Sequence, residues 1–257
     1  MGYKDILVYL DPTPASAVRL AIALRIAALD GAYVSAVDAT ADQAFLGDWR
    51  EAATQIEGAF REALKGADLT GDFHVAGATG RLADFTYPAD LVVAPSPSPE
   101  HHKLIRAGVP DEVVMQAGAP VLAIPMDWPG GPCGKRVVIA WNASREARRA
   151  VRDALPILRR AEEVVVFVFS KAESPLRASA QNLVTYLGRH GVQAHISDWT
   201  HTGDVSAIEA MFASLDTQNA DLVVAGAFGH SRVFETLFGS VSHDLLAQPV
   251  LPVLMSH

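Results

Sequence analysis

Short, almost wholly hydrophobic runs alternate along the chain with longer segments in which hydrophobic residues recur every three to four positions. Hydrophobic runs of this length predict strands that are buried on both faces, and the longer spacing predicts helices that cover a sheet with one side. The first run, Lys4–Asp11, ends in Asp11-Pro12 and leads into the helical pattern of Ala15–Leu29. The chain therefore begins with a predicted strand, turn and helix.

The same alternation continues to the end of the chain, and its regularity predicts an α/β fold in which a parallel sheet carries helices on both faces. In the first half, strands are predicted at Lys4–Asp11, Ala32–Ala39, Phe73–Ala78, Asp90–Ala94 (ending at Pro95) and Pro120–Pro125, with helices at Ala15–Leu29, Asp48–Lys65 and Asp111–Ala117. In the second half, strands are predicted at Lys135–Asn142, Glu163–Ser170, Gln193–Thr200, Ala220–Ala225 and Pro249–Met255, with helices at Ser144–Ala161, Arg177–His190, Val205–Asn219 and Val241–Gln248.

The two halves also repeat one another in sequence. The hexapeptide Ala-Asp-Leu-Val-Val-Ala occurs at 89–94 and again at 220–225, and the first strands of the two halves are separated by the same 131 positions. Pro-Val-Leu occurs at 120–122 and at 249–251, which makes the second copy two residues shorter before its last strand. Because a proline- and glycine-rich stretch separates the copies, we predict a tandem duplication with a first domain at 1–128, a linker at 129–134 and a second domain at 135–257.

Composition narrows the class of protein. The chain carries 29 Asp and Glu against 21 Lys and Arg, a net charge of −8, which argues against a general grip on the phosphate backbone of nucleic acid. Its single cysteine, Cys133, excludes an intramolecular disulfide. The first predicted strand leaves no room for a signal peptide, and no hydrophobic run reaches the roughly 18 residues of a membrane helix. We therefore expect a cytoplasmic protein that binds neither nucleic acid nor membranes.

A glycine pattern follows the fourth predicted strand of the second half. Gly226 and Gly229 are followed after nine residues by Gly239-Ser240, at the start of the predicted helix Val241–Gln248. Glycine turns let the backbone come close to a ligand, and a helix N-terminus offers unpaired N–H groups to an anion. The pattern therefore predicts a phosphate-binding loop, with turn glycines and a helix-capping serine as the alternative.

On these residues the chain resembles the universal stress protein family, in the tandem form and over essentially its whole length. ATP-binding members of that family carry G-x2-G-x9-G-[S/T] after the fourth strand, and the spacing here matches throughout. The resemblance implies two Rossmann-like, doubly wound domains, each a five-stranded parallel sheet in the order 3-2-1-4-5. Ligands of such open sheets bind at the carboxyl ends of strands one and four.

The resemblance further implies that ATP, or a related adenine nucleotide, binds the second domain. Family members that bind ATP usually have Asp where this chain has Asn142, and because a neutral amide is a poorer metal ligand, a role for Mg²⁺ stays open. Asn142 as a helix cap is the alternative to a binding role. The implied contacts are Ala140 and Asn142 beneath the nucleotide, Val168 against the adenine, Ala225, Gly226 and Gly229 around the ribose and phosphates, and His230, Gly239, Ser240, Val241 and Ser242 along the phosphate chain.

The first copy has lost this loop. Pro95 and Ser98 stand where the second copy has Gly226 and Gly229, and Val109-Pro110 follows the remaining Gly108. Proline has a fixed φ and no N–H, so this loop cannot cradle phosphates in the same way. We predict that the first domain does not bind ATP.

The sequence assigns no catalytic residue and no metal-ligand set. It contains neither the G-x4-G-K-[S/T] phosphate loop nor a G-x-S-x-G nucleophile elbow. We therefore expect a stress-response sensor or regulator rather than a committed catalyst. Slow ATP hydrolysis and a nucleotide-free interaction module stay open as alternatives. In addition, the last strands of the two copies would pair in an intramolecular pseudo-dimer, and a homodimer of the chain stays open.

Overall fold

The structure is a computed structural model that describes residues 2–38, 40, 49–75, 85, 89–96, 111–171, 174–201, 205–227, 245 and 250–257. The chain divides into two compact units, a first unit at Met1–Gly130 and a second unit at Gly131–His257. None of the described helices combines the length and the hydropathy that a membrane crossing needs.

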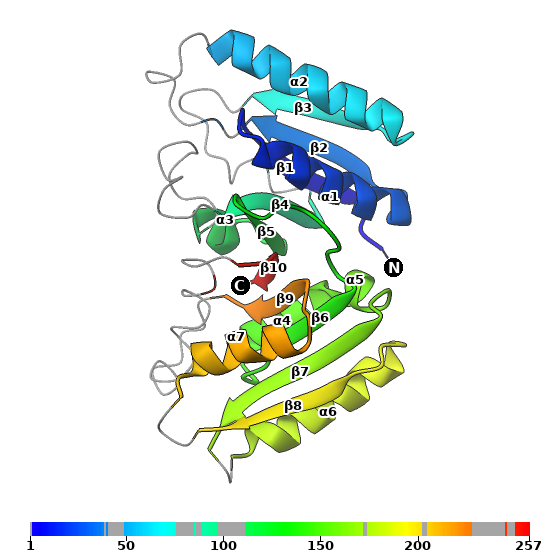
Figure 1. The fold of residues 1–257 in the computed structure, drawn as a ribbon. Coiled ribbons are helices and arrows are strands. Elements are labelled where there is room, and N and C mark those ends of the chain that lie inside the picture. The colour runs from blue at the N-terminus through cyan, green and yellow to red at the C-terminus, as the bar shows by residue number, and fades with distance from the viewer. Residues whose placement is uncertain are drawn as a thin grey trace. The chain divides into compact units, whose positions relative to one another are not determined.

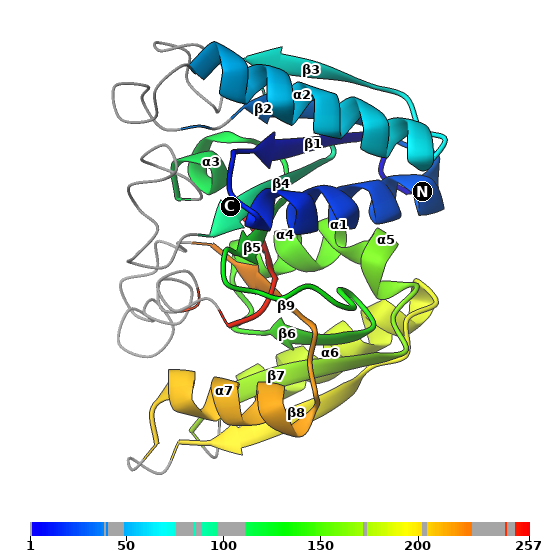
Figure 2. The ribbon, with the colours of Figure 1, turned by 45° about the horizontal axis from the view of Figure 1, so that its top comes forward.

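The described strands of the first unit form a parallel sheet in the order β3-β2-β1-β4-β5. Helices α1 and α2 lie on one face of this sheet and α3 lies on the other (Figures 1 and 2). The elements are β1 (Asp5–Leu10), α1 (Ala15–Asp30), β2 (Tyr33–Asp38), α2 (Trp49–Gly66), β3 (Gly71–Val75), β4 (Leu91–Ser96), α3 (Asp111–Gln116) and β5 (Val121–Pro125).

The described strands of the second unit follow the same order, β8-β7-β6-β9-β10, and are again parallel. Helices α4 and α6 cover one face of the sheet and α7 covers the other. The elements are β6 (Arg136–Ala140), α4 (Arg145–Asp153), α5 (Leu155–Leu158), β7 (Glu163–Ser170), α6 (Leu176–Arg189), β8 (His195–Thr200), α7 (Ala207–Thr217), β9 (Leu222–Gly226) and β10 (Val253–Ser256). The predicted α/β fold with parallel sheets is confirmed.

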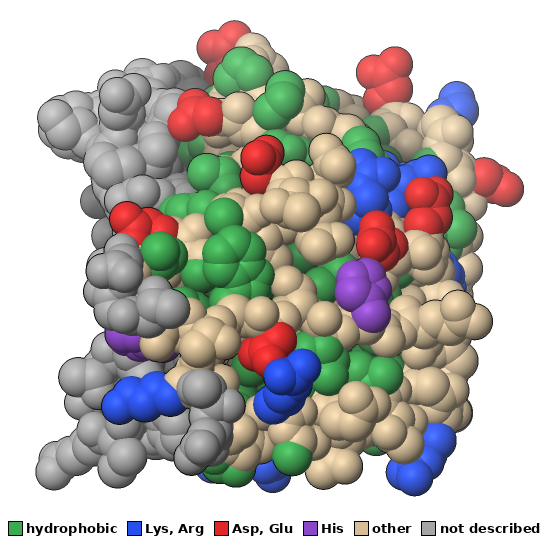
Figure 3. All heavy atoms as spheres, turned by 60° about the horizontal axis from the view of Figure 1, so that its bottom comes forward, with side chains coloured by type: hydrophobic (Ala, Val, Ile, Leu, Met, Phe, Trp, Pro, Cys, Tyr) green, Lys and Arg blue, Asp and Glu red, His purple; other side chains and the backbone are tan. Residues whose placement is uncertain are grey.

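The central strands are buried on both faces because helices cover both sides of each sheet. All six residues of β4 are buried, as are the six interior residues of β7. This explains why these strands appear in the sequence as continuous hydrophobic runs rather than as alternating ones. On the surface, acidic and basic side chains are interspersed, with hydrophobic side chains between them on the face in Figure 3.

The aspartate of the repeated hexapeptide makes the same kind of contact in both units. In the second unit, Asp221 is buried, and its carboxylate accepts N–H groups of Gly134 (2.7 Å), Lys135 (2.9 Å) and Arg136 (3.1 Å) at the start of β6. In the first unit, the carboxylate of Asp90 accepts the N–H groups that open β1, at 2.7 and 3.2 Å. The aspartate before the fourth strand thus satisfies the unpaired backbone donors at the start of the first strand.

Strand β4 runs two residues beyond its predicted end. Pro95 and Ser96 pair with Ile124 and Pro125 of β5, so the prediction that the strand stops at Pro95 is wrong. The missing N–H of Pro95 is tolerated because the pairing of β4 with β1 ends two residues earlier, at Val93.

The last strand of the second unit also differs from its prediction. Val223 N donates to Pro252 O at 3.0 Å, just as Val92 N donates to Pro120 O at 3.0 Å. The segment equivalent to Pro120-Val121-Leu122 is therefore Pro252-Val253-Leu254, and the second copy is one residue longer here, not two shorter. Pro-Val-Leu occurs twice in succession, at 249–251 and at 252–254. The second tripeptide forms the strand: Val253 is only 2% exposed, whereas Val250 is 59% exposed.

The helix predicted at Ser144–Ala161 is two helices. Pro156 has no N–H to donate to the carbonyl of Arg152, so the hydrogen-bond ladder of α4 is interrupted. It resumes in α5, where Ile157 N and Leu158 N both donate to Ala154 O at 2.9 Å. The predicted helix Val241–Gln248 lies outside the described residues except for Leu245, which is helical and buried.

The aspartate contacts predict a difference between two equivalent substitutions. Asp221→Ala removes a buried acceptor of three N–H groups and should lower the free energy of unfolding of the second unit by about 2–4 kcal/mol. Asp90→Ala removes an exposed acceptor and should cost clearly less. Urea unfolding of the full chain, followed by circular dichroism, measures both, with the exposed Asp216→Ala on α7 as the control. Equal losses for Asp221→Ala and Asp216→Ala would contradict this role.

Candidate functional site

The carboxyl edge of the second unit brings together predicted site residues from neighbouring strands. Ala140, the last residue of β6, is the Cα partner of Ala225 in β9, and β9 ends one residue later at Gly226. Val168 lies two residues before the end of β7 and is completely buried. The fold therefore places Ala140, Ala225 and Gly226 at one point of the sheet edge, with Val168 on the next strand.

Gly226 lies against the first turn of α4. A Cβ atom added at this position would be 2.4 Å from Ala147 N and 2.7 Å from the carbonyl carbon of Glu146. Contacts this close exclude any side chain unless the helix moves. Glycine is therefore required at the end of β9 for the packing of helix on strand, whether or not a ligand approaches it.

Asn142 caps the turn between β6 and α4. Its Oδ1 accepts the N–H of Ser144 at 3.0 Å, and Ser144 Oγ in turn accepts the N–H of Ala147 at 3.0 Å. This is an Asx turn followed by a helix N-cap. Within the described residues, the amide Nδ2 of Asn142 has no hydrogen-bond partner, so this half-buried side chain retains two donors at the sheet edge.

The residue between these two caps has an unusual backbone. Ala143 has φ of 59°, in the left-handed region that residues with a Cβ rarely adopt. The equivalent residue of the first unit is Pro12, whose ring fixes φ near −65°. The two units therefore connect their first strand and first helix with different backbone conformations.

Glu146 lies in the first turn of α4, where its backbone and Cβ pack against Gly226. It is buried, and burial alone would raise its pKa, but hydrogen bonds from the backbone and the Arg145 guanidinium outweigh that effect and hold the pKa below the usual value. Arg145 Nη2 lies 3.2 Å from its carboxylate. The Glu146 carboxylate therefore places a negative charge in the first turn of α4, where the positive end of the helix dipole stabilises it.

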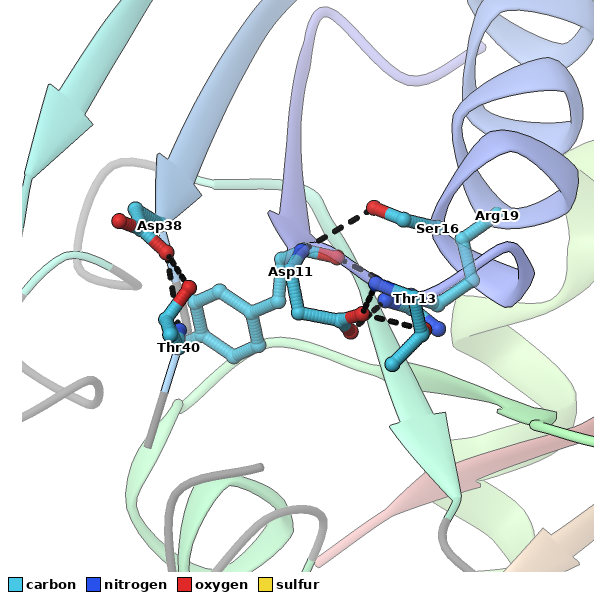
Figure 4. A network of polar contacts seen from close by, with 7 residues as sticks. Asp11, Thr13, Ser16, Arg19, Asp38 and Thr40 are labelled. Carbon is cyan, nitrogen blue, oxygen red and sulfur yellow. Dashed lines mark hydrogen bonds and ion pairs between the residues drawn. The ribbon is translucent and has the colours of Figure 1, made fainter. Parts of the chain in front are cut away.

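In the first unit, the residue equivalent to Asn142 is Asp11, which belongs to a buried ion pair. Figure 4 shows Asp11 between Thr13 and Arg19: Oδ1 accepts the Thr13 N–H at 2.8 Å, and Oδ2 pairs with Arg19 Nη2. Arg19 Nε also donates to Tyr9 O at 3.1 Å, and both side chains of the pair are fully buried. Burial lowers the pKa of Arg19, against the opposing effect of Asp11. The Asp11 carboxylate is thus committed to contacts within the protein.

The remaining predicted site residues lie outside the described residues; they are Gly229, His230, Gly239, Ser240, Val241 and Ser242. Among the described residues, no three His, Cys, Asp or Glu side chains are grouped as a metal would require.

Sequence reasoning missed Arg19, Ala143 and Glu146. An arginine within the hydrophobic pattern of the first helix was the available signal for a buried ion pair, whereas nothing in the sequence marks the backbone of Ala143.

Comparison with known proteins identifies this architecture. The family model of the universal stress protein family matches residues 134–257, which is almost the whole second unit. A universal stress protein from Archaeoglobus fulgidus has the same fold: the match covers 98% of this chain and 95% of that one, with a TM-score of 0.76 and 15% identity. A protein from Pseudomonas aeruginosa with the same family description matches over 99% and 93%, with a TM-score of 0.64 and 17% identity.

No curated protein sequence matches the chain at a significant level. The structural likeness extends over both units, whereas the sequence match is confined to the second, the unit that keeps the glycine pattern. The segment 134–257 is therefore a domain of the universal stress protein family.

Proposed function

We propose that the second unit binds ATP, or a related adenine nucleotide, at the carboxyl edge of its sheet and that the protein acts as a nucleotide-dependent regulator in the stress response. The observation that carries the proposal is the position of the glycine motif. G-x2-G-x9-G-S continues directly from β9, whose last residues lie beside the end of β6. Open α/β sheets bind ligands at this kind of edge.

The phosphates would be held by backbone groups of the motif. Gly229, Gly239 and Ser240 supply conformational freedom and N–H donors, with Val241 and Ser242 continuing the helix start, and His230 adding a donor to the phosphate chain. Gly226 would act differently. Because α4 packs against it, its part is to bring the first turn of that helix next to the motif.

Asn142 would bind the nucleotide through its amide nitrogen. Its Oδ1 already accepts the Ser144 N–H, which leaves Nδ2 as the group able to donate to a ribose or phosphate oxygen. A metal ion could bind Asn142 only through Oδ1, which already accepts the Ser144 N–H. We infer that the nucleotide is held without Mg²⁺ bound to Asn142. Ala140 and Ala225 would lie beneath the nucleotide at the sheet edge, and Val168, which is completely buried, would support the site from below rather than contact the adenine.

The first unit would remain empty of nucleotide for two reasons. Its loop has Pro95 and Ser98 in place of two glycines of the motif. Its Asp11 is buried in an ion pair with Arg19, and separating the pair would leave a buried charge uncompensated, at a cost of roughly 3–5 kcal/mol. One nucleotide per chain is therefore expected.

Calorimetric titration of ligand-free full-length protein with ATP tests this proposal. Micromolar-range binding at one site per chain is expected, and the double variant Gly229→Val/Ser240→Ala should weaken it at least about tenfold, because the loop then loses its close approach to the phosphates. Ser98→Val, at the equivalent position of the first unit, is the matched control and should bind like the wild type.

Three results would reject the proposal. Absence of heat and of a thermal shift with ATP, ADP and AMP would leave a nucleotide-free interaction module. Two equivalent sites per chain, or equal weakening in Ser98→Val, would show that the glycine motif does not define the site.

The geometry of Asn142 predicts how Mg²⁺ acts. In the wild type, Mg²⁺ should change the ATP dissociation constant by less than about threefold, well under the tenfold that 1.4 kcal/mol represents. In Asn142→Asp the turn is kept, but the new carboxylate repels the phosphates, so ATP without Mg²⁺ should bind about tenfold more weakly and Mg²⁺ should restore the affinity. A wild type that requires Mg²⁺ as strongly as this variant does would contradict the inference.

A further inference from the structure

The second unit contains a cavity between two helices on one face of its sheet. It has a volume of about 650 Å³ and lies between α4 and α6. Of the described residues that line it, none belongs to the glycine motif and none is Asn142 or Gly226. The lining consists of Trp141, Arg145, Arg148, Arg149, Val151 and Arg152 on one side and Ser179, Asn182, Leu183 and Tyr186 of α6 on the other.

Four arginines form the α4 wall of this cavity. Positions 145, 148, 149 and 152 follow the i, i+3, i+4, i+7 spacing of a single helix face, and seven residues of helix span roughly 10 Å. The arginines also reach solvent: the side chain of Arg145 is 83% exposed and that of Arg152 is 67% exposed. Of the four arginines that line the cavity, Arg145, Arg148 and Arg152 are therefore exposed, and Arg149 is half-buried.

The ion pairs of the described residues neutralise only part of the positive charge of these arginines. Glu146 pairs with Arg145 at 3.2 Å, and Asp153 lies 3.5 Å from both Arg149 and Arg152. Arg148 has no carboxylate partner among the described residues. Among the described residues, two carboxylates therefore pair with the four arginines, which makes this wall cationic on a chain whose net charge is −8.

The first unit provides an internal comparison. It has a cavity of about 440 Å³ between α1 and α2, the equivalent pair of helices. The positions 131 residues before the four arginines are Pro14, Ala17, Val18 and Ala21, and both alanines line that cavity. The groove between the helices thus belongs to the fold, whereas its row of positive charge belongs to the second unit alone.

The chemistry of the cavity specifies its ligand. Guanidinium groups bind phosphate, sulfate and carboxylate through paired hydrogen bonds. Val151, Leu183 and the Tyr186 ring supply hydrophobic and aromatic surface, and Ser179 and Asn182 supply polar groups on the opposite wall. The volume lies in the range of small-molecule sites. We propose that this cavity binds a small organic anion with two or more phosphate, sulfate or carboxylate groups on an aromatic or hydrophobic body, independently of the nucleotide site.

Pyranine, an aromatic compound with three sulfonate groups, is a suitable probe for the full-length protein. Fluorescence anisotropy should report one pyranine site per chain, weakened by added salt. Arg148→Ala/Arg152→Ala should weaken binding at least about tenfold, since two paired anion contacts are lost. Arg148→Lys keeps the charge but loses the paired hydrogen bonds, so its affinity for pyranine should lie between that of the wild type and that of the double variant. Arg189→Ala removes an exposed arginine of α6 outside the cavity and should bind like the wild type.

Three outcomes would overturn the proposal, provided that circular dichroism shows each variant to be folded. The first is absence of pyranine binding. If a polyglutamate peptide, tested in parallel, bound where pyranine did not, the surface would recognise an acidic chain rather than a small organic anion. The second is equal weakening by Arg189→Ala, which would indicate general attraction to positive charge. The third is complete competition by ATP together with loss of pyranine binding in Gly229→Val, which would place the probe in the nucleotide site.

Discussion

The close contact between the end of β9 and the first turn of α4 determines the arrangement of the second unit's sheet edge. A Cβ atom on Gly226 would lie 2.4 Å from Ala147 N, so the strand and the helix meet backbone to backbone. This contact places the Asn142–Ser144 turn beside the point where the glycine motif begins. The first glycine of that motif therefore has a structural reason that is independent of any ligand, and the binding argument depends on the glycines that follow it.

The two units show how one fold diverges after duplication. The strand order and the aspartate that satisfies the first strand are retained in both. The turn after the first strand differs: Asp11 is buried with Arg19 in the first unit, whereas the amide nitrogen of Asn142 in the second has no partner within the described part of the chain. The groove between the first two helices also differs, with alanines in one unit and arginines in the other. Retained features explain the fold, and the divergent ones concentrate at the proposed sites.

The strand and helix order could be predicted from the sequence because buried parallel strands and amphipathic helices leave strong hydrophobic patterns. Other features could not. Pro95 stays within β4 because the pairing of β4 with β1 has already ended at Val93, which is a property of sheet register. The repeated Pro-Val-Leu allowed two alignments, and only burial chooses between them. The Gly226 contact, the Ala143 backbone and the row of arginines along a cavity arise from how distant segments pack.

Hydrogen exchange of the full-length chain with and without ATP tests the central claim most directly, because it reports each segment of both units in one experiment. The account predicts added protection at 140–144 and 225–242 of the second unit, and none at the equivalent 95–110 segment of the first. Protection confined to the first unit, equal protection in both, or no change at either edge would contradict it.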